Sequence, residues 1–269
     1  MSIDLIAGER HVRVRSFNRA SVEAAVQGVA PRIVTDLVVV FGGWGAGDGG
    51  AAMPAQGGQD TGTTQLIGKL RALKSSAGSQ MVVRAWHGQL RATVSEAEDF
   101  VRSQFHPIGK LILCGYSAGG FNAMALSRAL HTTGYFNVNT REFLAYYHPS
   151  TNTARHVVGI ARVDLLVTID AAQGPMSSMN SRAVAPSVRR NVNVFQLNPS
   201  GTDSGTGSDV AIAPRSHGGP NTAMDESATR VENHDWTARY AASPRAGHGT
   251  IDNDAIETVV SAVRAELGG

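Results

Sequence analysis

The sequence predicts an α/β domain built on a mostly parallel sheet with helices on both faces. Short, continuous apolar runs recur along the 269 residues, and such runs are typical of strands buried on both faces of a parallel sheet. Longer amphipathic segments alternate with them, as the connecting helices of a parallel sheet would. The apolar fraction of 42% and the charged fraction of 17% are ordinary for a globular protein with a large core.

The predicted elements follow from these two patterns. The strands are expected at residues 36–41, 81–86, 110–114, 163–169, 191–197 and 230–234, and the helices at residues 63–75, 93–105, 119–132 and 254–267. The last helix has a start signal, because Asp254 followed by Glu257 resembles a capping box. The alternating segment "HVRVRSF" near the N-terminus predicts a half-exposed strand at an antiparallel edge of the sheet.

Residues 1–269 are expected to form one domain, since neither a repeat nor a linker divides the chain. Two segments interrupt the alternation of strands and helices. Residues 133–162 are rich in aromatic side chains and are expected to form a cap or lid, and residues 199–222 form a long Gly-, Ser- and Asp-rich loop. Long irregular insertions are frequently functional. For residues 199–222, the alternative is a surface loop without a function.

Composition narrows the classes of partner. The net charge of +2 predicts no nucleic-acid partner, and no apolar run approaches the roughly 18 residues that cross a bilayer. The single cysteine, Cys114, excludes an internal disulfide framework. The N-terminal residues lack the basic flank and apolar core of a signal peptide, so the expected location is cytoplasmic. Export by a route that leaves no cleavable signal is compatible with the same sequence.

The segment "KLILCGYSAGGFNAMALSRAL" carries the strongest chemical signal. Gly115-Tyr116-Ser117-Ala118-Gly119 is a G-x-S-x-G motif, with an apolar strand before it and an amphipathic helix after it. On such a tight turn the serine hydroxyl projects above the sheet, and a Cβ two residues before or after the serine would clash with the neighbouring backbone. The pattern predicts that Ser117 is a nucleophile.

A nucleophilic serine needs a base, and the base needs an acid that orients it. On a strand–turn–helix of this kind the acid and then the base follow in the chain. Asp170 ends the strand in "VDLLVTIDAAQGP" and is the predicted acid. His248, in the Gly-flanked loop "AGHGTID", is the predicted base, and His217 in "SHGGPN" is the alternative.

The motifs "GYSAGG", "LVTIDAAQGP" and "GHGTID", in this order, resemble those of α/β-hydrolases of the bacterial lipase and esterase type. The resemblance covers essentially the whole chain and implies the α/β-hydrolase fold. An acid directly after the strand beside the nucleophile strand is similar to the arrangement in pancreatic-type lipases. Many other members place the acid one strand later, which keeps Asp203 and Asp209 as alternatives.

The glycine-rich stretch "VVVFGGWGAGDGG" has two interpretations. Gly45, Gly47 and Gly50 match the dinucleotide-binding pattern G-x-G-x-x-G, but Pro54 and further glycines follow where that site requires a helix. The resemblance instead implies an oxyanion loop, whose donor follows a His-Gly or Gly-Gly step. Trp44 N–H is then the first choice for the second oxyanion donor and Gly43 N–H the second choice; Ala118, after the nucleophile, supplies the other donor.

The predicted reaction is hydrolysis of a carboxylic ester, soluble or lipid, through an acyl-enzyme, with transient contact to a lipid surface compatible with a lipid ester. Tyr116, Phe143, Tyr146 and Tyr147 are the predicted substrate-binding residues, and aromatic packing onto the core is the alternative for the last three. The same triad could cleave thioesters or amides. Alternatives of another class are an NAD(P)-dependent oxidoreductase that uses the loop at residues 42–50 and a hydrolase-fold protein that binds without catalysing. No cofactor and no metal are expected.

Overall fold

The computed structural model describes residues 3–7, 10–14, 34–43, 62–74, 79–86, 88, 91–105, 109–131, 134–137, 142–144, 154–157, 162–172, 181–198, 218–241 and 248–268. Contacts within the chain divide it into two compact units, Met1–Val34 and Thr35–Gly269. The second unit contains the main sheet and every described residue of the candidate site.

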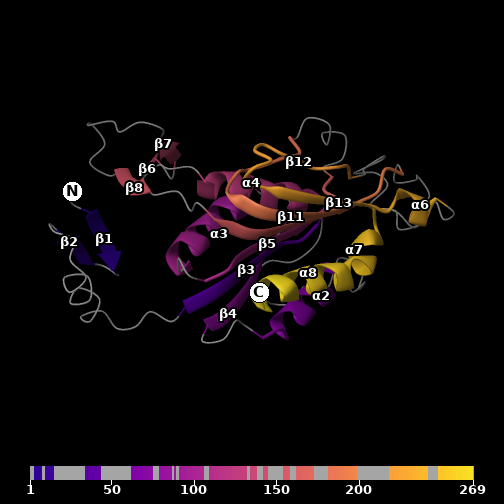
Figure 1. Cartoon of the computed structure of the whole chain (residues 1–269), viewed down its shortest axis with the longest axis horizontal. Helices are drawn as coiled ribbons and strands as arrows, with labels where there is room; N and C mark the ends of the chain where they lie inside the picture. The colour runs from indigo at the N-terminus through magenta and orange to yellow at the C-terminus, as the bar shows by residue number, and fades with distance from the viewer. Residues whose placement is uncertain are drawn as a thin grey trace. The chain divides into compact units, whose positions relative to one another are not determined.

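A six-stranded sheet forms the centre of the second unit (Figure 1). Its strand order is β13-β11-β9-β5-β3-β4, and the pairs from β13 to β3 are parallel. The strands are β3 (Val34–Phe41), β4 (Ser79–Trp86), β5 (Leu111–Tyr116), β9 (Val163–Ile169), β11 (Val188–Phe195) and β13 (Arg230–Asp235). All six lie where the apolar runs predict them, so the predicted fold class is confirmed.

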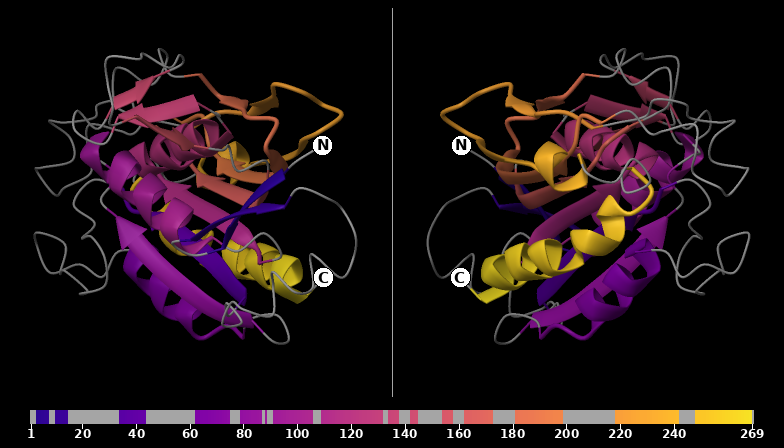
Figure 2. Two further views of the ribbon diagram at one scale, coloured as in Figure 1. Left: turned by 90° about the vertical axis from the view of Figure 1, so that its left-hand side faces the viewer. Right: turned by 90° about the vertical axis from the view of Figure 1, so that its right-hand side faces the viewer.

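Helices cover both faces of this sheet, as Figure 2 shows. The main helices are α2 (Gly62–Arg71), α3 (Arg91–Gln104), α4 (Ala118–His131) and α8 (Ile256–Gly268). Side chains of β5 alternate between the two faces: Leu111 and Leu113 pack with α3 and α4, whereas Ile112 and Cys114 pack with α2 and α8. This alternation follows from the pleat of a strand, and it is why each β5 residue in the run is apolar.

The predicted C-terminal helix is interrupted at its start. The short helix α7 (Ile251–Asp254) precedes α8, and Ala255 separates the two. The Asp254 carboxylate accepts a hydrogen bond from the Tyr240 hydroxyl (2.8 Å) and lies 3.6 Å from the Arg239 guanidinium. The predicted capping box is therefore wrong, because Asp254 ends one helix and its carboxylate binds the short helix α6 (Thr237–Tyr240).

The predicted antiparallel edge strand lies elsewhere. Strand β2 (Arg10–Val14) pairs with β1 (Ile3–Ala7) in a two-stranded antiparallel sheet of the first unit. Within residues 133–162, the strands β6 (Gly134–Asn137), β7 (Glu142–Leu144) and β8 (Ala154–Val157) form a separate antiparallel sheet in the order β7-β6-β8. The short strands β10 (Ala183–Val184) and β12 (Thr222–Ala223) form a parallel pair.

Buried amides tie the segment at residues 218–223 to the sheet. Asn193 on β11 donates to the Gly219 carbonyl (2.9 Å) and to the Asn233 side chain (2.7 Å). Asn221 donates to Thr168 (2.9 Å) and Asn191 (3.0 Å). Buried amides need partners, so these side chains fix the backbone at residues 218–223.

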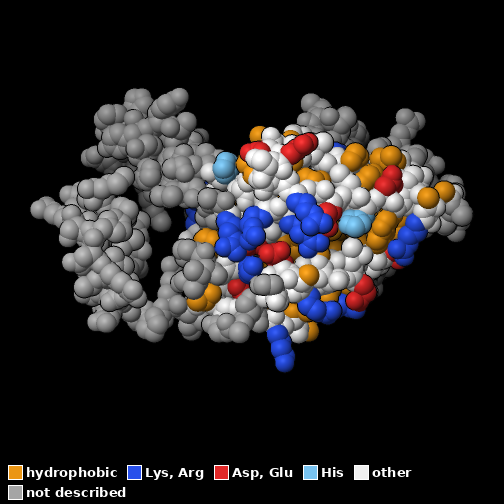
Figure 3. Space-filling model, viewed as in Figure 1, with side chains coloured by type: hydrophobic (Ala, Val, Ile, Leu, Met, Phe, Trp, Pro, Cys, Tyr) orange, Lys and Arg blue, Asp and Glu red, His pale blue; other side chains and the backbone are white. Residues whose placement is uncertain are grey.

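The surface seen in Figure 3 mixes charges of both signs. Arg190 on β11 forms two hydrogen bonds with Glu232 on β13 (2.8 and 2.9 Å), and Arg230 lies 3.0 Å from the same carboxylate. Glu232 thereby links two neighbouring parallel strands near their amino-terminal ends. Among the described residues, no helix is long and apolar enough to cross a membrane.

Two glycines in helices should respond in opposite ways to alanine. Gly68 in α2 has open space around its Cα, so Gly68→Ala should raise the free energy of unfolding by about 1 kcal/mol through helix propensity. A Cβ on Gly120 in α4 would lie 2.6 Å from the Ala171 Cβ, so Gly120→Ala should lower it by about 1–3 kcal/mol. Urea unfolding of both variants tests this; equal stabilisation would contradict the predicted contact.

Candidate active site

The turn between β5 and α4 holds Ser117 in a left-handed backbone conformation. Its φ of 55° is uncommon for a residue with a side chain. Backbone hydrogen bonds hold the turn: the Ser117 N–H donates to the Ile169 carbonyl (3.0 Å), and the Ser117 carbonyl accepts from Gly120 (3.0 Å) and Ala172 (3.2 Å). The neighbouring segment after β9 thus fixes Ser117 at the carboxyl edge of the sheet.

Glycines flank this turn because backbones approach it too closely for a side chain. A Cβ on Gly115 would lie 2.1 Å from the Gly119 carbonyl oxygen, and a Cβ on Gly119 would lie 2.4 Å from the carbonyl oxygens of Phe41 and Gly42. These contacts confirm the predicted crowding two residues before and two after Ser117. They also bring the N-terminus of α4 against the end of β3.

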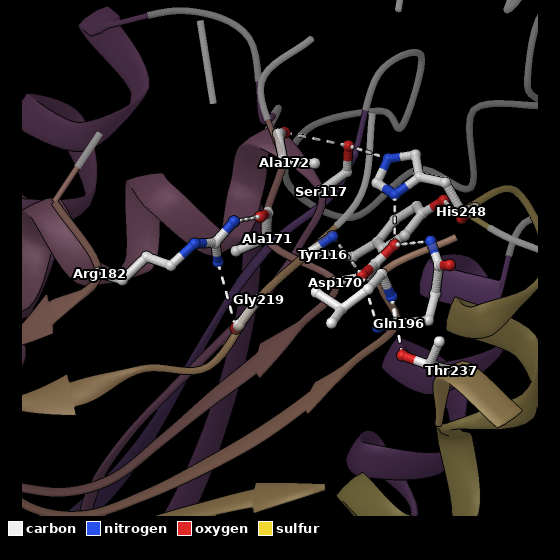
Figure 4. Close-up of polar contacts among 12 residues, drawn as sticks. Tyr116, Ser117, Asp170, Ala171, Ala172, Arg182, Gln196, Gly219, Thr237 and His248 are labelled. Carbon is white, nitrogen blue, oxygen red and sulfur yellow. Dashed lines mark hydrogen bonds and ion pairs between the residues drawn. The ribbon is translucent and has the colours of Figure 1, made fainter. Parts of the chain in front are cut away.

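Ser117, His248 and Asp170 form a continuous hydrogen-bonded chain (Figure 4). The Ser117 Oγ lies 2.7 Å from the His248 Nε2, and the His248 Nδ1 lies 2.7 Å from the Asp170 Oδ2. A carboxylate accepts hydrogen bonds, so it assigns the proton to Nδ1 and leaves Nε2 to accept from the serine hydroxyl. The three residues predicted from the sequence therefore lie in a row, each within hydrogen-bond distance of the next. Activation of a serine by a general base requires such distances.

Asp170 is fully buried at the end of β9, and four donors surround its carboxylate. Besides His248, the donors are the Gly218 N–H (2.6 Å to Oδ1), the Gln196 N–H (3.1 Å to Oδ1) and the Gln196 Nε2 (3.2 Å to Oδ2). A Cβ on Gly218 would lie 2.2 Å from Oδ1, so this donor is a glycine because its backbone approaches the carboxylate so closely. The acid is therefore held in one orientation.

Gln196 was missed by the sequence analysis. It follows β11 as Asp170 follows β9, and the carboxyl ends of neighbouring parallel strands meet at the same edge of a sheet. The position of Gln196 directly after a predicted strand is therefore the sequence signal that could have identified it. A buried amide at this position supplies two of the four donors to the acid.

The predicted oxyanion residues are described in part. Ala118 is the first residue of α4, where an N–H has no acceptor within the helix. Gly43 lies beside the nucleophile turn, because a Cβ on it would come 3.4 Å from the Ser117 Cβ and 2.7 Å from the Tyr116 ring. Trp44 lies outside the described residues, so the choice between Gly43 and Trp44 stays a prediction.

Tyr116 contacts His248, the predicted base. Its ring stacks on the His248 imidazole, with centroids 5.3 Å apart and an interplanar angle of 29°. Its hydroxyl donates a hydrogen bond to the His248 backbone carbonyl. The sequence analysis predicted a substrate contact for this residue and did not foresee these two interactions.

Other predicted residues are outside the described part of the chain. Phe143 lies in β7, but its side chain is not among those described, and the remaining residues that lie outside are Tyr146, Tyr147, His217, Asp203 and Asp209. Residues 44–50 of the glycine-rich loop are outside it too. Of the described residues, no group of three or more His, Cys, Asp or Glu side chains could hold a metal ion.

Arg182 links the backbone next to Asp170 with the backbone next to Gly218, which donates to the Asp170 carboxylate. Its guanidinium donates to the carbonyls of Ala171 (2.8 Å) and Gly219 (3.4 Å) and lies 5.3 Å from the Phe121 ring centroid. Burial lowers the pKa of Arg182, and the charge of Asp170 acts in the opposite direction. A cation that remains paired with backbone carbonyls at this position stabilises the neighbouring buried carboxylate.

Ser117 stands on a strand–turn–helix at the carboxyl edge of a parallel sheet, and its hydrogen-bonded partners Asp170 and His248 follow it in the chain. The fold is an α/β fold with a six-stranded, mostly parallel sheet flanked by helices. No family model and no curated protein matches the chain. Esterase B from Lactobacillus rhamnosis (HN001) is similar in structure with a TM-score of 0.40, 13% identity, and coverage of 88% of this chain and 77% of that chain. An iodinated complex of acetyl xylan esterase has a TM-score of 0.34, 16% identity, and coverage of 86% and 98%.

Asp252, four residues after His248, is a buried acid with a raised pKa. Burial raises its pKa to about 6, while the backbone N–H groups of Asn253 and Thr63 and the charge of His248 act in the opposite direction. Among the described residues, its Oδ1 has no hydrogen-bond partner. The folded state therefore favours the protonated carboxyl.

The pH dependence of stability should report this acid. Its contribution is present below about pH 4 and is lost as the pH rises through about 6. Asp252→Asn is neutral throughout, so its free energy of unfolding relative to wild type should rise by about 2 kcal/mol between about pH 4 and pH 7. Urea unfolding at both pH values measures it.

Asp225→Asn is a control of opposite sign. The hydroxyl and the N–H of Ser227 lower the pKa of the exposed Asp225 carboxyl, so its contribution is present at neutral pH and lost on acidification. This variant should lose stability relative to wild type as the pH rises toward about 4, and its relative stability should change little between about pH 4 and pH 7. A relative stability of Asp252→Asn that stays constant over this range would contradict the raised pKa.

Proposed function

We propose that this chain is a serine hydrolase that cleaves carboxylic esters through an acyl-enzyme. The observation that carries the proposal is the hydrogen-bonded chain from Ser117 through His248 to Asp170 at the carboxyl edge of the sheet. A serine at its free pKa is a weak nucleophile, and hydrogen bonding to a neutral imidazole is the usual way in which proteins activate it.

In the proposed first step, Ser117 Oγ attacks the ester carbonyl carbon while His248 Nε2 takes the hydroxyl proton. Asp170 keeps the Nδ1 proton in place and stabilises the imidazolium that forms. His248 then returns the proton to the departing alcohol. Attack by a water molecule, with His248 again as base, releases the acid and restores the serine.

The negative charge that develops on the carbonyl oxygen needs backbone donors. The Ala118 N–H stands at the first turn of α4, where the helix dipole favours negative charge. The loop after β3 supplies the second donor, from Gly43 or Trp44. The close approach of Gly43 to Ser117 supports a role of this loop next to the reacting atoms.

The proposed substrate class is a carboxylic ester, soluble or lipid. Hydrolysis of p-nitrophenyl esters of increasing acyl length, in solution and in micelles, identifies the preferred chain. A thioester and an amide offered in the same assay test the two related reactions of the same triad.

Labelling by a fluorophosphonate tests the nucleophile. The probe should modify wild-type protein at Ser117 and leave Ser117→Ala unmodified, because phosphonylation requires an activated serine hydroxyl. Ser103→Ala, which changes an exposed serine on α3, is the matched control and should be labelled fully. Folded wild-type protein that is not labelled, or labelling that persists in Ser117→Ala, would overturn the proposal.

The identity of the base is tested with two histidine variants. His248→Ala should lower kcat for p-nitrophenyl acetate by about 1,000-fold or more, because it removes the group within hydrogen-bond distance of the serine. His217→Ala should keep most of the activity. If instead His217→Ala abolished turnover and His248→Ala retained it, the assignment of the base would be wrong.

A further inference from the structure

Tyr116 lies at the end of β5, next to Ser117 in the chain and in contact with His248 and the Gly43 position. It is the last residue of β5, directly before Ser117, and its partner in the register of β5 and β9 is Ile169, directly before Asp170. A residue in the middle of a parallel sheet has less freedom than one in a loop. The strand ends that carry the nucleophile and the acid therefore also carry Tyr116.

His248, in contrast, lies in a turn that precedes α7. Its backbone carbonyl accepts a hydrogen bond from the Tyr116 hydroxyl, and its imidazole stacks on the Tyr116 ring. The hydrogen bond sets the position of the backbone, and the stacking sets the plane of the imidazole. In Figure 4 the Tyr116 ring lies alongside the imidazole, which points toward Ser117 and Asp170.

The same ring also contacts the loop after β3. A Cβ on Gly43 would lie 2.7 Å and 2.8 Å from two carbons of the Tyr116 ring, so only a glycine allows the present approach. One side chain thus packs between the base and the predicted oxyanion loop. Tyr116 is half-buried, and its contacts with His248 and Gly43 occupy part of the ring that a substrate contact would need.

We propose that Tyr116 is a positioning residue, which holds His248 in register with Ser117 through the carbonyl hydrogen bond and the stacked ring. The inference rests on the proposed function, because it assigns Tyr116 a role in the same reaction. In this role Tyr116 acts by positioning His248, and not by the substrate contact that the sequence predicted. Misplacement of a catalytic group by about 1 Å can cost on the order of 100-fold in rate, so such a role has a large kinetic effect.

Two variants separate the two contacts. Tyr116→Phe removes the hydrogen bond and keeps the ring, so kcat for p-nitrophenyl acetate should fall by about tenfold. Tyr116→Leu removes both contacts, and kcat should fall by about 100-fold. In both variants KM should stay within about twofold of wild type, and kcat should fall by the same factor for acetyl, butyryl and octanoyl esters, because the effect acts on the base.

Tyr240→Phe is the matched control. It removes another tyrosine hydroxyl, at the end of α6, which donates to Asp254 at the end of α7 (2.8 Å) and not to His248. Its kcat should equal that of wild type, although its melting temperature is expected to fall. Melting temperatures of all variants, measured under assay conditions, restrict the comparison to folded protein.

Labelling distinguishes the failure of this inference from the failure of the proposed function. If the fluorophosphonate labels wild-type Ser117 and reacts about tenfold more slowly with Tyr116→Phe, the inference is supported. The positioning role is wrong if wild type is labelled but Tyr116→Phe retains its kcat. It is also wrong if the KM of the Tyr116 variants, relative to wild type, rises with the acyl length of the ester. In both cases the proposed serine hydrolase function is still supported. If folded wild type is not labelled at all, both fail.

Discussion

The buried carboxylate of Asp170 is the constraint on which the rest of the site depends. A charge that is fully removed from water is costly unless donors surround it. The donors come from three segments: the end of β11, the backbone at Gly218 and the turn at His248. Since one carboxylate needs all of them, three distant parts of the sequence are drawn to one edge of the sheet. The buried amides of β11 and the guanidinium of Arg182 hold the second segment in place.

Close approach of backbones is the second constraint. Gly115 and Gly119 allow α4 to begin directly against the strand ends, and Gly43 allows the loop after β3 to lie against Tyr116. A nucleophile needs its base and its oxyanion donors within a few ångströms, and side chains on these loops would separate them. The close approach of Gly43 to Tyr116 and Ser117 therefore has a geometric reason that does not require a dinucleotide. The strain at Ser117 is compatible with this arrangement because backbone hydrogen bonds from the segment after β9 hold the turn.

The sequence analysis succeeded where one residue pattern has one physical cause. Buried parallel strands must be apolar on both faces, so the six runs predicted the six strands, and the motif around Ser117 predicted the turn. It failed where a local pattern has two outcomes. The alternating "HVRVRSF" forms a hairpin with β1 instead of an edge of the main sheet, because pairing partners are not encoded in the alternation. Asp254 resembles a helix cap, but Tyr240 and Arg239 compete for its carboxylate.

By itself the sequence determined the fold class, the order of the strands along the chain and the candidates Ser117, Asp170 and His248, whose catalytic roles stay predictions. These follow from periodicity and from motifs, which act over a few residues. Only the tertiary structure decided which groups meet at the edge of the sheet: that His248 lies between Ser117 and Asp170, that Gln196 supplies two hydrogen bonds to the Asp170 carboxylate, and that Tyr116 contacts His248 through its hydroxyl and its ring. The reason is that contacts between residues 26 to 132 positions apart depend on strand order and register, which local patterns do not specify.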